Sequence, residues 1–126
     1  VDGKDVTIIG TGGTVGNAVE AALLLHREGI SARVLNASSI KPVDEDAIIK
    51  AAKETRGLVT VEDHNILAGL GGAVAEVLTN RAPARLLRLG VNDVFGESGE
   101  PDALYAYHGL NADGIAGSVR EFLANL

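Results

Sequence analysis

The sequence has no cysteine, methionine or tryptophan, and it has only two phenylalanines and two tyrosines in 126 residues. The lack of cysteine excludes a disulfide scaffold and thiolate catalysis, and it makes a cytoplasmic protein the default expectation. No apolar run approaches the ~18 residues of a membrane-spanning helix, so we expect no membrane partner. A net charge of −6 argues against a nucleic-acid partner, because that surface needs a basic stripe.

The remaining composition is that of a globular domain. Hydrophobic residues make up 46% of the chain and charged residues 22%, and there are 16 glycines. These fractions exclude a disordered chain, and the length fits one domain spanning residues 1–126.

Short β-branched or apolar runs alternate with stretches of helical periodicity. We expect strands at 6–9, 32–36, 58–61 and 85–89, and helices at 14–28, 44–56, 70–80, 102–107 and from 111 or 113 onward. Gly29 and Gly57 would close the first two helices, and Asp44 would cap the start of the second. This order predicts an α/β fold with a parallel sheet and right-handed crossovers.

Three loops would follow strands at the edge where such sheets bind ligands. They are residues 10–13, 62–69 and 90–99, and all three are rich in glycine or charge. We therefore expect an interface or a ligand at this edge.

The first of these loops has a spacing close to a dinucleotide-binding fingerprint. Gly10, Gly12, Gly13 and Gly16 miss the G-x-G-x-x-G pattern by one residue, and Asn36 stands where an acidic residue is expected. The turn either binds a cofactor or, as we favour, lets the helix pack closely on the strand.

The second loop begins with two carboxylates and an imidazole. Strand alternation would put Glu62 and His64 on one face and Asp63 on the other. Glu62 could orient His64 for general acid–base chemistry. The alternative, which we favour because no nucleophile is near, is a loop histidine that meets backbone or a partner domain.

The third loop carries Phe95, followed by Glu97 and Ser98. A phenylalanine in an acidic, glycine-rich loop either anchors a contact with another surface or folds back as a local plug. The chain's three histidines lack the mutual spacing of metal ligands, so we expect no metal site.

Several segments together resemble the carboxy-terminal domain of transketolases. They are VTIIGTG at 6–12, GISARVL at 29–35, IKPVD at 40–44, VTVEDHNILAGLGGAVAEVL at 59–78, LGVNDVFGESGEP at 89–101 and HGLNADGI at 108–115. The resemblance covers essentially the whole chain, in the right order, and is closest to the often split-gene kind. It implies a three-layer α/β/α sandwich with a mostly parallel sheet of four to five strands.

The resemblance also implies a role within a larger enzyme. Transketolases move a two-carbon ketol unit between sugar phosphates, as in the pentose phosphate pathway, with thiamine diphosphate and Mg²⁺ or Ca²⁺. Other domains of the family hold that cofactor, so we assign no catalytic, cofactor-binding or metal-binding residue here. The implied partners are the remaining domains or an amino-terminal subunit, in a homodimeric enzyme.

Two other functions remain open from the sequence alone. One is the equivalent domain of a 2-oxoacid dehydrogenase or oxidoreductase. The other is a free-standing nucleotide-binding module that uses the turn at 10–16.

Overall fold

A computed structural model describes residues 3–37, 44–65, 69–91 and 109–126, without the side chains of 63–65 and 91. Strands and helices alternate along the chain as predicted. The elements are β1 (Val6–Gly10), α1 (Thr14–Arg27), β2 (Ala32–Asn36), α2 (Glu45–Glu54), β3 (Leu58–Asn65), α3 (Leu70–Arg81), β4 (Leu86–Val91) and α5 (Ala112–Ala124). The helix expected at 102–107 lies outside the described residues.

The four strands form one parallel sheet in the order β2-β1-β3-β4. Ile8 of β1 has Val34 of β2 on one side and Val59 of β3 on the other. The chain therefore leaves β1 in one direction and later returns to build β3 and β4 in the other. This reversal puts the topological switch point at the carboxyl ends of β1 and β3.

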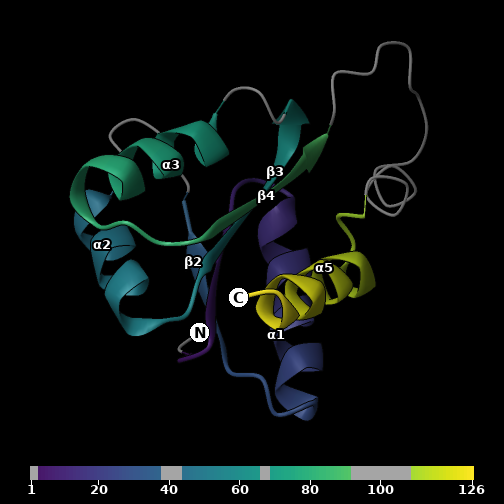
Figure 1. The fold of residues 1–126 in the computed structure, drawn as a ribbon. Coiled ribbons are helices and arrows are strands. Elements are labelled where there is room, and N and C mark those ends of the chain that lie inside the picture. Colours follow the sequence, from purple (N-terminus) through teal and green to yellow (C-terminus); the bar gives the residue numbers. More distant parts are fainter. Residues whose placement is uncertain (1–2, 38–43, 66–68, 92–108) are drawn as a thin grey trace.

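Helices cover both faces of the sheet, which confirms the predicted α/β/α layers (Figure 1). One core cluster joins α1 and α5 to the sheet and includes Ile8, Leu25 and Ile115, all fully buried. The other joins α2 and α3 to the opposite face through Leu58 and Val74. Each fully buried side chain of this size contributes roughly 1.5–3 kcal/mol, so the two clusters hold the layers together.

Helix ends follow the sequence in two cases and differ from it in a third. The Asp44 carboxylate accepts a hydrogen bond from Ala47 N at 3.0 Å, and Gly29 has a φ of +83°, as a glycine after a helix often does. Gly57, however, does not close α2, which ends at Glu54. A side chain at Gly57 would meet the Phe122 ring, because its Cβ would lie 2.7 Å from Cε2. This glycine therefore serves the packing of α5.

The third strand is longer than predicted. We expected a loop from Glu62, but β3 runs to Asn65, which is in register with Val91 of β4 after a shift in the pairing. Continued pairing with β4 keeps this polar segment extended although its composition is typical of a loop. The fourth strand is also displaced, starting at Leu86 instead of Arg85.

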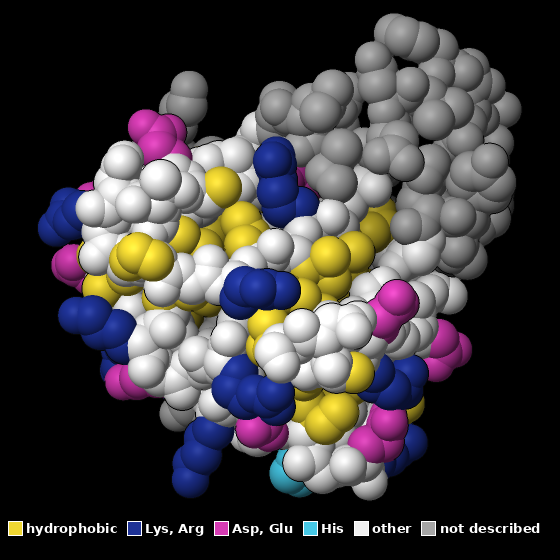
Figure 2. Space-filling view, in the orientation of Figure 1, with side chains coloured by type: hydrophobic (Ala, Val, Ile, Leu, Met, Phe, Trp, Pro, Cys, Tyr) yellow, Lys and Arg dark blue, Asp and Glu magenta, His cyan; other side chains and the backbone are white. Residues whose placement is uncertain are grey.

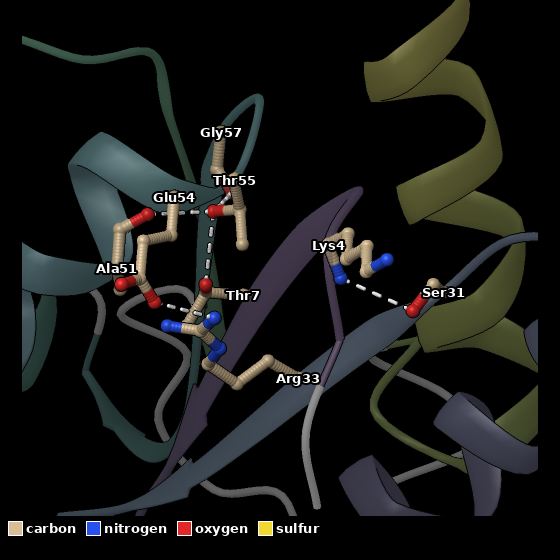
Figure 3. A network of polar contacts seen from close by, with 8 residues as sticks. All are labelled: Lys4, Thr7, Ser31, Arg33, Ala51, Glu54, Thr55 and Gly57. Atoms are coloured by element: carbon tan, nitrogen blue, oxygen red, sulfur yellow. Dashed lines mark hydrogen bonds and ion pairs between the residues drawn. The ribbon is translucent and has the colours of Figure 1, made fainter.

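The amino-terminal ends of the strands are held by a polar network (Figure 3). The hydroxyls of Thr7 and Thr55 lie 2.9 Å apart, and the Thr55 hydroxyl donates to the Ala51 carbonyl at 2.8 Å. Arg33 pairs with Glu54 at 2.8 Å. These contacts fix the end of α2 against β1 and β2. They lie at the edge of the sheet opposite the switch point.

Candidate functional site

The candidate site lies at the switch point, where β1 ends beside β3. Gly10, the last residue of β1, is in register with Val61 of β3, and Glu62 follows directly within β3. The structure therefore brings the glycine turn and Glu62 to the same edge of the sheet, as the sequence predicts. At this edge the glycine turn and Glu62 make contacts within the protein.

The glycine turn is filled by the residues that follow it. A Cβ on Gly10 would lie 3.2 Å from the Thr14 hydroxyl and 3.4 Å from Val15 Cα, so the first turn of α1 packs directly on the strand end. Gly12 has a φ of +55°, a conformation that favours glycine. Gly13 is the N-cap residue of α1 and makes no side-chain cap. This geometry supports the close-packing interpretation of the turn.

The Thr14 hydroxyl joins the turn to the neighbouring strand. It accepts a hydrogen bond from Thr11 N at 3.1 Å, and its proton lies between the carbonyls of Thr11, at 2.6 Å, and Val61, at 2.9 Å. Thr14 is fully buried. The Thr11 hydroxyl has no hydrogen-bond partner, but it is enclosed by protein atoms. The hydroxyls of Thr11 and Thr14 therefore face the protein interior.

Glu62 is the buried charge of the site, with 1% of its surface exposed. Its two carboxylate oxygens accept hydrogen bonds from Leu70 N at 3.3 Å and Gly71 N at 2.8 Å. These are the first backbone N–H groups of α3, where a negative charge is stabilised by the helix dipole. Glu62 thus caps α3 from a strand, and its carboxylate already has partners.

The other predicted site residues are placed only in part. Asp63 and His64 belong to β3 by their backbone, while their side chains are outside the described part of the structure. Phe95, Glu97 and Ser98 lie in residues 92–108, which are also outside it. The pairing of Glu62 with His64 and the contact through Phe95 therefore stay predictions.

The described residues do not fit a diphosphate bound through a metal ion. They contain no group of three His, Cys, Asp or Glu side chains placed to hold a metal. The one carboxylate buried at the switch point is engaged by α3, and the glycine turn is packed by Thr14 and Val15.

No helix in the described part of the chain is long and apolar enough to cross a membrane.

The cap made by Glu62 was not predicted, although the sequence contains a signal for it. Helix α3 starts Leu-Gly-Gly after Gly69, so neither its N-cap residue nor its first turn offers an acidic or hydroxyl side chain. A helix that begins this way needs an acceptor from elsewhere. Leu58, Thr60 and Glu62 share one face of β3, and Glu62 is the acidic residue among them.

Comparison with known proteins agrees with this architecture. The sequence profile of the family "Transketolase, C-terminal domain" matches residues 1–115. The "Putative transketolase C-terminal section" of Methanocaldococcus jannaschii is 51% identical over 96% of this chain and 38% of its own length. An apulose-4-phosphate transketolase subunit of Phocaeicola vulgatus is 45% identical over 98% and 39%, respectively. The chain thus spans about two fifths of these relatives.

Solved structures show the same fold. A split-gene transketolase, solved as an inactive beta4 tetramer, has a TM-score of 0.89 and 43% identity over 98% of this chain and 39% of its own. A 2-oxoglutarate:ferredoxin oxidoreductase from Magnetococcus marinus shares the fold alone, with a TM-score of 0.66 and 17% identity. Profile, relatives and fold agree, and the chain belongs to the transketolase C-terminal domain family.

Proposed function

We propose that this chain is the structural and assembly domain of a thiamine-diphosphate-dependent ketol transferase, and that it does not bind the cofactor itself. The observation that carries this proposal is the use of Glu62 at the switch point. The position where α/β folds commonly hold an anion at a helix start is occupied by the chain's own carboxylate. Membership of the family indicates the class of enzyme. The bonding of Glu62 within the protein favours a structural role for this domain over cofactor binding.

The named relatives leave the substrate open. Among them are an apulose-4-phosphate transketolase subunit, a 6-deoxy-6-sulfo-D-fructose transketolase subunit and a 1-deoxy-D-xylulose-5-phosphate synthase of Heliobacterium modesticaldum. The transketolase subunits are the more similar, with 43–51% identity against 42% for the synthase. We therefore favour transfer of a ketol unit between sugar phosphates, with an amino-terminal subunit or domain carrying the cofactor.

A domain exchange tests the proposal. Residues 1–126 would replace the matching segment of the M. jannaschii relative, and the chimera would be mixed with that organism's amino-terminal section, thiamine diphosphate and Mg²⁺. We expect ketol transfer from the chimera and none from the 126-residue chain alone. A relative truncated before the matching segment is the control, and turnover by the isolated chain would contradict the proposal.

The nucleotide-binding alternative is tested separately by calorimetry. The isolated chain would be titrated with NAD, FAD and ATP at millimolar concentration. We expect no binding heat, because Thr14 and Val15 pack directly against Gly10 at the turn. Saturable binding that is lost in a Gly10→Val variant, still folded by circular dichroism, would favour the alternative.

A further inference from the structure

The sheet has one edge that differs from its interior. Within the described residues, β4 pairs with β3 and with no other strand. The first five residues of β3 are all buried, whereas every described residue of β4 is only partly buried. The helices of the two outer layers therefore cover the first five residues of β3 completely and the described residues of β4 incompletely.

The partly covered side chains of β4 are mostly leucines. Leu87 and Leu89 pack at the margin of the α1 and α5 cluster, and Leu86 packs at the margin of the α2 and α3 cluster. In Figure 2, hydrophobic side chains form a band between the two helical layers on the face where β4 lies in front, with Lys and Arg side chains among them. Both core clusters thus reach the surface along this strand.

The backbone of β4 also has a defined open side. Leu58 N donates to the Arg85 carbonyl at 3.0 Å, which fixes the phase of the parallel pairing with β3. In that phase, alternate residues direct their N–H and C=O groups toward β3. The groups of Leu86, Arg88 and Gly90 consequently point away from β3, where a further strand would bond.

We infer that β4 pairs antiparallel with β4 of a second copy of this chain, about a two-fold axis at Leu87. The inference rests on the proposed assembly role and specifies its partner. A split-gene transketolase 43% identical to this chain is described as an inactive "beta4" tetramer, where "beta4" names the assembly and not a strand. Self-association is therefore known for a relative. A two-fold axis at a sheet edge joins two sheets into one continuous sheet and leaves no open edge between them.

Side-chain pairing favours the register with the axis at Leu87 over the one with the axis at Arg88. Pairing Arg88 with its own copy would put two like charges directly opposite, which is destabilising. Pairing Arg88 with the partner's Leu86 avoids this and still uses the outward-pointing backbone groups. It also puts Leu87 opposite the partner's Leu87, and Arg85 opposite the partner's Leu89.

An acidic strand from a different protein is the competing occupant. Arg85 is exposed directly before β4, so an acidic strand would gain charge attraction there. The two occupants respond to salt in opposite ways. Two copies of a basic strand repel each other less at high ionic strength, whereas an acidic partner would be released.

Cross-linking tests the register in the 126-residue chain. The natural sequence has no cysteine, so a single Leu87→Cys variant has one thiol. At the two-fold axis this residue is a non-hydrogen-bonded pair with Cα atoms about 4.5 Å apart, a separation that a disulfide spans. Under mild oxidation with copper phenanthroline we expect a covalent dimer forming at least tenfold faster than in a Leu23→Cys control, which replaces a leucine of α1 that is 55% exposed.

The outcomes are distinct. Leu87→Cys cross-linking at the rate of Leu23→Cys, with the reduced variants folded by circular dichroism, would overturn the inference, as would faster linking of a Leu89→Cys variant. A wild-type dimer in sedimentation that weakens with added NaCl, or that survives a Leu87→Lys substitution, would also overturn it. None of these results bears on the domain exchange, so this pairing and the proposed function can fail independently.

Discussion

Helices α1 and α3 follow neighbouring parallel strands, yet their first turns are stabilised by different means. After β1, glycines bring α1 so close to the strand that a threonine hydroxyl and backbone groups complete the hydrogen bonds. At α3, the carboxylate of Glu62, which is buried within β3, is set against the start of the helix. The first turn of α1 is neutral and tightly packed, and the first turn of α3 depends on an internal charge.

The comparison shows that the usual ligand edge of an α/β sheet can be used for structure. The side chains of Thr14 and Glu62, which lie at this edge, are already bonded within the protein. The charged turn should be the more costly to disturb, because hydrogen bonds to ionised groups are about twice as strong as neutral ones. Three predictions test this ranking.

The largest effect is expected at the charged turn. Glu62→Leu leaves two buried N–H groups at the start of α3 without an acceptor, and it should lower the free energy of unfolding by about 3 kcal/mol. Glu62→Gln keeps one carbonyl oxygen and should lose about half as much. Urea unfolding at pH 7 measures both, with Glu76→Gln on the exposed side of α3 as the control. Equal stabilities of Glu62→Leu and wild type would show that the Glu62 charge does not stabilise the start of α3.

A smaller loss is expected at the neutral turn. Thr14→Val preserves the shape of the side chain but removes its hydrogen bonds to Thr11 and Val61, at a cost of about 1–2 kcal/mol. Thr79→Val is the matched control, because the Thr79 hydroxyl bonds to its own helix at an exposed position. A loss for Thr14→Val larger than that for Glu62→Leu would reverse the ranking of the two turns.

The smallest effect is expected for a charge pair in solvent, which separates charge from burial. Arg120 donates two hydrogen bonds to Glu28, at 2.6 and 2.7 Å, and these bonds hold the pKa of Glu28 below its ordinary value of 4.5. A carboxyl with a lowered pKa stabilises the folded state above its unfolded pKa, and this contribution is lost as the pH falls through the folded pKa.

The corresponding variant is Arg120→Gln, measured by thermal unfolding. Its Tm should lie slightly below that of the wild type at pH 7, and the gap should close as the pH falls below 4.5. Lys50→Gln, at an exposed position of α2, should show no such closing. A gap that is constant with pH would assign the Arg120 effect to packing instead of the ion pair.

Most of the fold could be predicted from the sequence because local signals agree with one another there. The β-branched runs, the Asp44 cap and Gly29 each act within a few residues, and each was found where predicted. The errors have tertiary causes. Pairing with β4 extends β3 beyond Val61, and the Phe122 ring, 65 positions along the chain, explains Gly57.

The position of the site was predicted from the sequence, whereas the role of Glu62 was not. Parallel strand order was enough to bring Gly10 and Glu62 to one edge. The partner of Glu62 could not be read from spacing, because the strand alternation that pairs it with His64 also points it toward α3. Which of the two it meets depends on where the next helix begins.

The last helix has a consequence for how the protein is made. Ile115, Val119 and Leu123 complete one of the two cores, and Arg120 reaches back to Glu28 near the beginning of the chain. While the ribosome is still translating this domain, α1 and one face of the sheet therefore stand without their cover. Until α5 emerges, that apolar face is exposed to chaperones and to other nascent chains.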